Sequence, residues 1–533
     1  MIVQAFHAHN TAEGTTSSVR DENHPATLRG DMLGRAALAV VGVMTVLSVV
    51  RAFGPLTYPG DIWRQSDTAT IARNFADNGL MLFFPQINWG GAGPGYVETE
   101  FPLMPWLSAL LYQVFGEQVW LRRLVSLAFM LVATAAFWQL ASRLLPARAA
   151  RWALIAFAVS PAFMRYGTAF MPEATVLAFY LLALVAFQRW LAQDRGRWLV
   201  GAAAATSMAA LVKPTSLHIG LVMLVWLLIS ARQRLRRPSL YVAGVAALVA
   251  PALWLRHASG LYTEYGNTFG VISGGDNKFG NLRIWLSPEF YLGNLRSEVF
   301  FVYGFVGVPL AVLGAWWLWR HRGPVFPLVV AGLLALGVYY FAVGRYSGSD
   351  MGIQYHVYSL PYAALLTGLG LQRVWQWLRR AGSVRRPGAV AGVVVALLAA
   401  QSVNVFQAAM RDQGGRFQVC ATQLREVTAP GDRVVISTTS PSVDAGVANN
   451  WQEPVIFFMA DRKGWSLAAD RHDPAVLAEQ QRLGARFFVV NDPRLVPAGG
   501  PLAMWLTTHA AQVRSSAVNG CGIWALNTPG RAA

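Results

Sequence analysis

PEATVLAFYLLALVAFQRWL, residues 172–191, is the stretch that decides the fold of this chain. As a helix, these 20 residues are about 30 Å long, which matches the hydrocarbon core of a bilayer. Backbone polar groups in lipid have to be satisfied within their own segment, so a stretch of this kind forms a helix and not a loop. The chain is therefore expected to work in a membrane.

Other stretches of the chain share this apolar character. The sequence is 54% hydrophobic and 13% charged, whereas soluble domains carry about 25% charged residues. Residues 102–115 are too short and too interrupted by proline to span, and they predict a helix lying on the membrane surface. We predict an all-α polytopic membrane protein with eleven spans, near residues 32–52, 122–144, 150–165, 172–191, 197–212, 214–231, 238–256, 299–319, 325–343, 355–376 and 387–409.

Arginine clusters at every second junction predict the orientation of these spans. Seventeen arginines lie at one set of junctions, whereas the short junctions of the other set hold only Arg165, Lys213 and Arg345. Basic junctions stay in the cytoplasm, which makes residues 1–31 a cytoplasmic tail and places the other junctions in the periplasm of a bacterial inner membrane. The first 30 residues show no cleavable signal peptide, so the first span is expected to be retained. The net charge of +17 comes from the junctions and not from one basic domain, which argues against nucleic-acid binding.

The C-terminal part of the chain, residues 411–533, changes character. Residues 433–437 (RVVIS) and 485–490 (ARFFVV) predict buried strands, and residues 474–483 predict a helix between them. This pattern indicates a small periplasmic α/β domain, which follows the membrane domain of residues 32–410. The two cysteines of the chain, Cys420 and Cys521, both lie in it. Disulfides persist outside the cytoplasm, so a bridge is expected, with two free buried thiols as the alternative.

Charged residues on the outer face are the main indication of function. The first outer loop contains Asp61, Arg64 and Asp67, and apolar residues at helical spacing place Asp67 near the start of a short surface helix. Glu98 and Glu100 precede the second surface helix. Helix capping is the structural alternative for these acids.

Further charges stand at the outer ends of spans: Arg165, Glu173, Lys213 and Arg345. A charge at membrane depth is a candidate functional residue, although long basic side chains also reach the interface simply to stay solvated. Carboxylates beside cations at an apolar boundary suit an acceptor hydroxyl that needs a base and a lipid phosphate that leaves. From the residues alone, the pattern predicts a membrane enzyme or transporter that acts on an anionic amphiphile.

The order of elements resembles the GT-C glycosyltransferases, in particular the protein O-mannosyltransferases and lipid A aminoarabinose transferases. Residues 67–75 are similar to the helix that opens with the loop acid of that family, although the usual Asp-Glu pair is Asp67-Thr68 here. Residues 100–103 (EFPL), 171–173 (MPE), 211–213 (LVK) and 354–361 (QYHVYSLP) resemble further family motifs. The resemblance covers about residues 32–410, and the tail is also similar to periplasmic tails of the family.

This resemblance implies an inverting glycosyltransferase that moves a sugar from a polyprenyl-phosphate donor to a periplasmic lipid, glycan or protein. Asp67 is the expected base, and either Asp61 or Glu98 could replace the missing second carboxylate. No cofactor is required, but a divalent metal is possible. The expected site comprises catalytic Asp67, Glu100 and Asp61; donor phosphate-binding Arg165, Lys213, Arg64 and Arg345; and substrate-binding Glu98, Glu173, Tyr355 and His356.

Two other classes of function fit parts of the sequence. A transporter or flippase of lipid-linked sugars would also need charges on the outer face, but an internal repeat of helices would then be expected, and none is evident. A scaffolding subunit would explain the spans and leave the outer charges without a purpose. The glycosyltransferase is the interpretation that accounts for both.

The arginine distribution gives a direct test of topology. Alkaline phosphatase fused after residue 411 should be active because the tail is expected in the periplasm. A cytoplasmic reporter at the same position should be silent. The opposite pattern would reverse the topology and move every outer-face residue to the cytoplasm.

Overall fold

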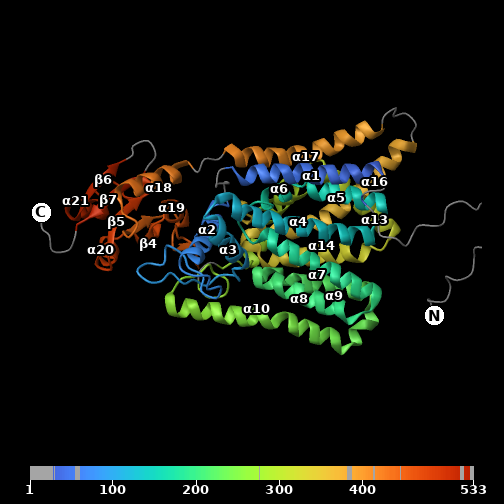
Figure 1. Cartoon of the computed structure of the whole chain (residues 1–533), viewed down its shortest axis with the longest axis horizontal. Coiled ribbons are helices and arrows are strands. Elements are labelled where there is room, and N and C mark those ends of the chain that lie inside the picture. The colour runs from blue at the N-terminus through green and yellow to red at the C-terminus, as the bar shows by residue number, and fades with distance from the viewer. Residues whose placement is uncertain are drawn as a thin grey trace, which may run out of the picture.

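A helical bundle and a small α/β domain form the two ends of an elongated molecule (Figure 1). The structure is a computed structural model, and it describes residues 28, 31–54, 61–274, 277–380, 387–411, 415–444, 446–515 and 521–527. The bundle helices run roughly along the long axis, and the two helices of the first outer loop lie between the bundle and the tail. The predicted tail of residues 1–31 lies almost wholly outside the described residues.

The bundle is built from helices whose ends follow local sequence signals. Asp31 caps the first helix by accepting a hydrogen bond from the backbone N–H of Gly34, 2.8 Å away. Ser160 and Pro161 end one helix and start another, since proline lacks a backbone donor. The main bundle helices are α1 (Met32–Ala52), α4 (Val119–Leu144), α5 (Ala147–Ala158), α6 (Pro161–Tyr166), α7 (Glu173–Gln193), α8 (Gly196–Val212), α9 (Ile219–Ala231), α10 (Pro238–Tyr265), α13 (Gly307–His321), α14 (Phe326–Ala342), α16 (Leu360–Arg380) and α17 (Pro387–Arg411).

The helices agree with the predicted spans in position, but not all are long enough to cross alone. Within the described chain, six helical segments pass the length and apolarity expected of a span, and they contain α1, α4, α7, α9, α10 and α17. A seventh is possible if Pro288–Tyr303 and α13, bent by 94°, form one broken span. The predicted span 150–165 is divided into α5 and α6, and α8 and α14 are shorter apolar helices. The predicted count of eleven is therefore not established by the structure.

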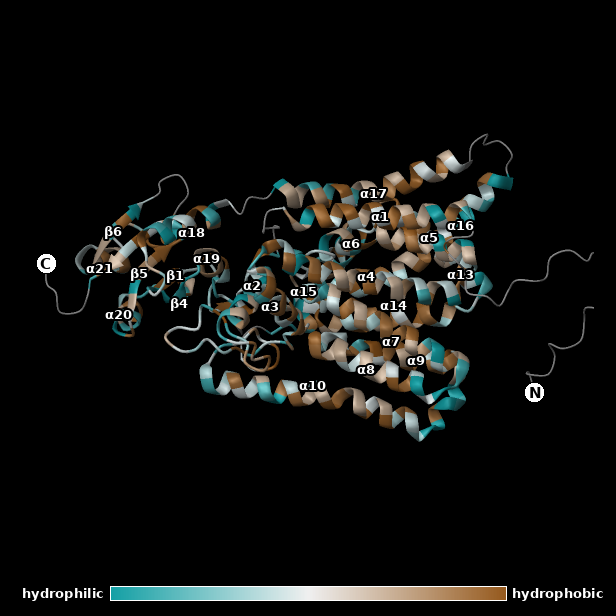
Figure 2. Ribbon diagram, in the orientation of Figure 1, coloured by the Kyte–Doolittle hydropathy of each residue, from teal (hydrophilic) through white to brown (hydrophobic). Residues whose placement is uncertain are grey.

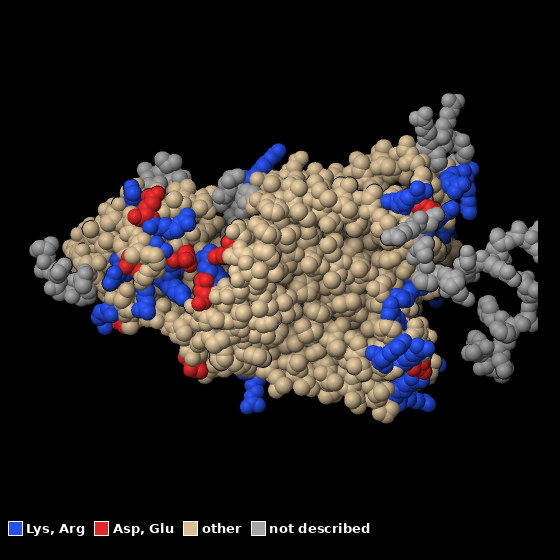
Figure 3. Space-filling model, in the orientation of Figure 1, with Lys and Arg blue, Asp and Glu red and all other residues tan. Residues whose placement is uncertain are grey.

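A broad apolar band separates two polar ends of the molecule. Figure 2 shows hydrophobic residues along the bundle helices and hydrophilic residues at their far ends and in the tail. On the face seen in Figure 3, basic residues gather at the end of the bundle that lies away from the tail, and the surface between the two ends is almost free of charge. This arrangement is the one that a bilayer requires.

Both helices predicted for the first outer loop are present. They are α2 (Ile62–Asp77) and α3 (Leu103–Phe115), which pack against each other. The connection between α2 and α3 meets the segment that follows α10, which we call the second outer loop: Glu98 forms an isolated bridge with Thr268. The same connection is joined to the end of α8, since the Phe101 backbone N–H donates to the carbonyl of Leu211. The outer loops are thereby joined to the bundle as one layer.

The tail domain contains a five-stranded sheet in the order β4-β1-β5-β7-β6. Strands β4 (Lys463–Leu467), β1 (Arg433–Ser437) and β5 (Ala485–Val490) are parallel, and β7 (Gly522–Leu526) and β6 (Ala510–Ser515) continue the sheet antiparallel. The predicted strands β1 and β5 and the predicted helix, α20 (Pro474–Arg482), are confirmed. Continuous apolar runs predicted them well because parallel strands are buried on both faces.

The outer loop completes the edge of this sheet. The Gly91 backbone N–H donates to the carbonyl of Gly464 at 2.7 Å, and the Gly464 N–H donates to the carbonyl of Asn88 at 2.9 Å. Helix α19 (Pro454–Ala460) packs on α2 beside this contact. An unpaired edge is a site for unwanted strand addition, so the loop both positions the tail and covers its edge.

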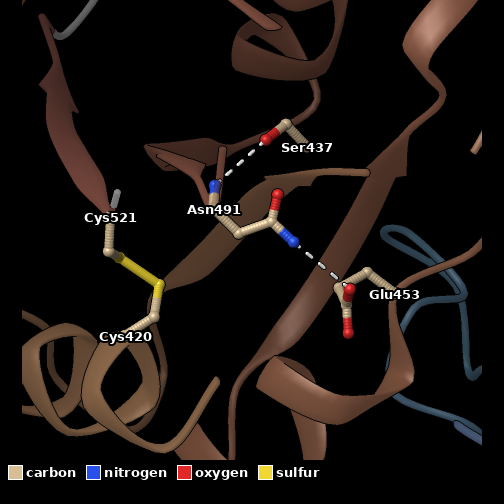
Figure 4. Close-up of a disulfide and its surroundings, with 5 residues drawn as sticks. All are labelled: Cys420, Ser437, Glu453, Asn491 and Cys521. Carbon is tan, nitrogen blue, oxygen red and sulfur yellow. Dashed lines mark hydrogen bonds between the residues drawn. A yellow bond between two sulfur atoms is a disulfide. The ribbon is translucent and has the colours of Figure 1, made fainter. Parts of the chain in front are cut away.

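The expected disulfide is present between Cys420 and Cys521 (Figure 4). The two Cα atoms lie 5.5 Å apart, and the bridge joins α18 (Gly415–Val427) to the residue that precedes β7. Both cysteines are buried. The bridge therefore connects the first helix of the tail to its last strand.

Loss of this bridge should destabilise the tail. The closed loop spans 101 residues, for which the chain-entropy model gives an upper figure of about 4–5 kcal/mol. The double variant Cys420→Ala/Cys521→Ala should lower the urea concentration at which the tail becomes sensitive to protease. Free thiols titrated in non-reduced, denatured wild-type protein would contradict the bridge.

Candidate active site

A cavity of about 250 Å³ opens where the bundle, the outer loops and the tail meet. Its walls come from the start of α2, the entry to α7, the turn after α8, the second outer loop, the segment before α16 and a loop of the tail. Six residues expected from the sequence line it: Asp61, Arg64, Glu100, Glu173, Lys213 and Tyr355. These six residues thus converge on one site, although they are spread from position 61 to position 355 of the sequence.

Each carboxylate that lines the cavity is paired with a cation. The Nε–H of Arg165 donates to Oδ2 of Asp61 at 2.8 Å, and both side chains are about 3% exposed. The Lys213 ammonium donates to Glu173 at 2.5 Å, and Arg64 donates to Glu100. A buried charge is tolerated only when it is neutralised, so these pairs allow three acids to stand at the apolar boundary.

Basic side chains in the layer below hold the Asp61–Arg165 pair in place. Nη1 of Arg51 donates to the carbonyls of Met164 and Arg165 and to the hydroxyl of Thr168, at 2.6–2.8 Å. Arg123 in turn donates to the carbonyl of Arg51 at 3.0 Å. The last turn of α1 and the short helix α6 are fixed to each other in this way, and Arg165 is aimed at Asp61.

The electrostatics of the cavity keep Glu100 ionised. Burial alone would raise the pKa of this carboxyl, but the charge of Arg64 and then that of Lys278 outweigh burial and lower the pKa to about 2. Arg64 also stands over the ring of Phe269, 4.6 Å from its centroid. Glu100 is therefore a fixed negative charge that orients Arg64 rather than a group that exchanges protons near neutral pH.

Asp67 does not lie where the sequence predicted. It is in the second turn of α2, it is fully buried, and it does not line the cavity. Its Oδ1 accepts a hydrogen bond from the indole N–H of Trp89 at 2.9 Å. The helix begins at Ile62 and not at Asp67. Asp67 follows Asp61 by six residues, which is a rotation of about 240° around a helix, so the two side chains lie on different faces.

Four other expected residues also lie outside the cavity wall. Glu98 accepts hydrogen bonds from the backbone N–H groups of Ile272 and Ser273, which shapes the second outer loop. His356 is buried between Glu298 and the carbonyl of Ser347. Arg345 reaches Asp444 of the tail at 3.4 Å. Arg165 acts through Asp61. These residues support the segments that form the cavity and do not line it themselves.

The structure also adds wall residues that the sequence did not single out. Lys278 of the second outer loop lines the cavity, as do Trp63 and Phe269. The tail contributes Ser440 and the amides Asn449 and Asn450. One signal pointed to Lys278: the chain has only three lysines, and two of them, Lys213 and Lys278, face this cavity. No sequence pattern marked the tail residues, because their place depends on how the tail docks.

The carboxylates of the site do not form a metal-ligand set. Among the residues that the structure describes, no three His, Cys, Asp or Glu side chains come together as ligands for one ion. Each cavity acid is already occupied by an arginine or a lysine.

Comparison with known proteins agrees with this architecture. The family model described as dolichyl-phosphate-mannose-protein mannosyltransferase matches residues 99–255, a segment that contains Glu100, Glu173 and Lys213. No curated protein sequence matches the chain. ArnT from Cupriavidus metallidurans, in a crystal structure bound to undecaprenyl phosphate, is similar over 93% of this chain and 98% of its own, with 17% identity and a TM-score of 0.64. The chain has the GT-C fold.

Two further structures with this GT-C fold are more distant. One is the oligosaccharyltransferase AglB from Archaeoglobus fulgidus, in complex with an inhibitory peptide and a dolichol-phosphate. The match covers 94% of this chain and 75% of the AglB chain, with 13% identity and a TM-score of 0.56. The other is the arabinofuranosyltransferase AftD from Mycobacteria, for which the match covers 92% of this chain and 40% of the AftD chain, with 16% identity and a TM-score of 0.51. The predicted resemblance to GT-C glycosyltransferases is confirmed at the level of the fold.

Asp67 should make stability depend on pH. Burial raises its pKa from the ordinary 3.8 to about 7; the charge of Glu453 in the tail adds to this rise, and the hydrogen bond from Trp89 and the charge of Arg64 oppose it. The folded protein therefore holds a proton that the unfolded chain releases near pH 4, and this contribution to stability is lost as pH rises through 7. The midpoint of thermal unfolding should fall between pH 5 and pH 8, by less in Asp67→Asn than in the wild type.

Asp350→Asn, at an exposed acid on the segment before α16, is the matched control and should keep the wild-type dependence. An unchanged pH profile in Asp67→Asn would show that this carboxyl is ionised in the folded protein.

Proposed function

We propose that this protein is a membrane glycosyltransferase that transfers a sugar from a polyprenyl-phosphate carrier to a hydroxyl group of an acceptor outside the cytoplasm. The observation that carries the proposal is the cavity itself, in which three carboxylates, two lysines and an arginine converge at an apolar boundary on a GT-C scaffold. The undecaprenyl phosphate of the ArnT structure and the dolichol-phosphate of the AglB structure support a lipid phosphate as the carrier.

Asp61 is the residue that we assign as the base, in place of Asp67. Asp61 lines the cavity, and Arg165 holds it through Oδ2. A carboxylate has a second oxygen, which can accept the proton of the acceptor hydroxyl as that oxygen attacks the anomeric carbon. Attack from the side opposite the phosphate inverts the configuration of that carbon. Arg165 is a positioning residue that holds Asp61 in its orientation.

The cations of the cavity serve the leaving group. As the bond between the anomeric carbon and the phosphate oxygen breaks, the carrier leaves as a phosphate monoester and gains negative charge. Lys278, Lys213 and Arg64 line the space in which that charge would develop. Fixed cations in a site with little water stabilise such charge without reorganisation. A phosphate of this kind is a good leaving group, so no strong general acid is needed.

The tail forms one wall of the cavity, and we assign the acceptor to that wall. Ser440, Asn449 and Asn450 are neutral hydrogen-bonding groups, whereas the opposite wall carries the charges. The indole N–H of Trp63 donates to the carbonyl of Gln452, so the tail loop is tied to α2 near Asp61. An acceptor hydroxyl held by these groups would approach Asp61 from the tail, while the carrier would approach from the membrane.

Asp61→Asn should abolish transfer while leaving carrier binding intact. The amide keeps the size of the side chain and cannot accept a proton, and a general base contributes about 100- to 10,000-fold to rate. Transfer is measured with radiolabelled polyprenyl-phosphate sugars on inner-membrane vesicles, and binding with undecaprenyl phosphate in detergent.

Asp67→Asn is the control, because this acid lies on the same helix outside the cavity. It should retain transfer. Loss of activity in Asp67→Asn with retention in Asp61→Asn would restore Asp67 as the base.

Lys278→Met should weaken binding of undecaprenyl phosphate about tenfold, because it removes one charged hydrogen bond to phosphate. Lys463→Met is the matched control, since Lys463 is the remaining lysine of the chain and is exposed at the start of β4. Equal affinities of the two variants for undecaprenyl phosphate would remove Lys278 from the carrier site. Lys278 is preferable to Lys213 for this test, since loss of Lys213 would leave the buried Glu173 without its cation.

A further inference from the structure

A second hollow lies in the bundle, within the apolar band. It is a groove of about 690 Å³ between α8, α9 and the first part of α10, and its lining is almost wholly apolar. Residues of α10 between Leu240 and Leu248 form one wall, and residues of α8 and α9 form the other. The groove is open to the surroundings, since Val245 and Leu248 on its wall are about half exposed. It shares no lining residue with the cavity that contains Asp61.

The groove exists because α10 stands away from the bundle at one end. None of residues 238–246 is buried, and the buried positions of α10 begin at Ala247. Figure 1 shows α10 along the lower edge of the bundle, and Figure 2 shows many hydrophobic residues along this helix. Gly220 of α9 and Gly244 of α10 both line the groove, and a Cβ at either position would have no neighbour within 4 Å. Protein atoms therefore leave this apolar space unfilled.

Arginines stand at the end of the groove where α9 is joined to α10. Leu235, within the turn η2 (Arg232–Arg236) that joins α9 to α10, and Leu240, just after that turn, line this end. Figure 3 shows basic residues gathered at this corner of the molecule, at the lower right. The end is the one opposite the tail and the cavity.

Two of these arginines are already used within the protein. Arg234 donates to the carbonyl of Trp190 at 2.8 Å, and Arg237 donates to Asp194 at 2.7 Å. By contrast, Arg232 and Arg236 are exposed, and neither forms an ion pair within the part of the chain that the structure describes. Both guanidinium groups are therefore available to an anion at the end of the apolar band.

We propose that this groove binds an anionic phospholipid from the leaflet opposite the cavity. An acyl chain would fill the apolar space between α9 and α10, and the phosphate would accept hydrogen bonds from Arg232 and Arg236. Guanidinium groups bind phosphate through paired N–H donors, and basic pockets between transmembrane helices bind anionic headgroups. The acyl chain and the phosphate of the lipid would thus both find a binding partner at the same groove.

The site would influence the distant cavity through α10. The outer end of this helix binds the first outer loop: the indole N–H of Trp254 donates to the carbonyl of Thr99, which precedes Glu100. His257 of the same helix end bonds the carbonyl of Phe83. A lipid that fills the groove would fix α10 to the bundle, and the loop that carries Glu100 would be held with it.

The test measures lipid retention on the intact protein. The wild type is reconstituted in nanodiscs of phosphatidylcholine with phosphatidylglycerol, released into detergent and weighed by native mass spectrometry. Bound phosphatidylglycerol should be retained over phosphatidylcholine. The variant Arg232→Gln/Arg236→Gln should lower its affinity about tenfold or more. The variant Arg320→Gln/Arg322→Gln, at exposed arginines at the end of α13 that do not line the groove, should leave it unchanged.

A second variant tests the groove without altering charge. Gly244→Phe would fill the space, so it should reduce retained phosphatidylglycerol while both arginines remain. Equal retention by wild type, Arg232→Gln/Arg236→Gln and Gly244→Phe would overturn the proposal. Displacement of phosphatidylglycerol by undecaprenyl phosphate at equal concentration would also overturn it, since the groove would then hold the carrier.

Discussion

Neutralisation of charge at an apolar boundary is the constraint on which this structure depends. Asp61, Glu100 and Glu173 stand where the bundle meets its outer layer, and each has its own cation. Removing one partner of a buried pair costs about 3–5 kcal/mol, because the other charge is left without compensation. The acids of the cavity are therefore coupled to the positions of α6, α8 and the start of α2, and none can move alone. A site built in this way is rigid before any substrate arrives.

The parts of the fold that follow from local pattern could be predicted from the sequence. The apolar stretch 172–191 became α7, and the strands at 433–437 and 485–490 formed where continuous apolar runs indicated them. Length was harder to judge, because a segment such as 150–165 is apolar throughout but is broken by Ser160 and Pro161. Hydropathy reports what can enter a membrane and does not show where the backbone bends.

The site was predicted less completely, for a geometric reason. Sequence spacing indicated a helix near Asp67 but did not fix its first residue. The helix starts at Ile62, so Asp67 lies in its second turn and on a face that points away from the cavity. The ion pairs were also hidden, since Arg165 and Asp61 are separated by 104 residues. Glu98 and His356 show the same limit, because a buried acid or histidine that supports a loop has the same sequence signature as one that meets a substrate.

The way the tail completes both the sheet edge and the cavity has a consequence for biosynthesis. The loop at residues 88–91 emerges from the ribosome long before β4, its partner at residue 464. Ser440, Asn449 and Asn450 also come late in the chain, so the cavity wall is closed only when the tail has folded on the outer loop. In a chain that is still being synthesised, the charged residues would therefore reach the membrane surface before the cavity around them is complete. Maturation of the site would coincide with the end of synthesis.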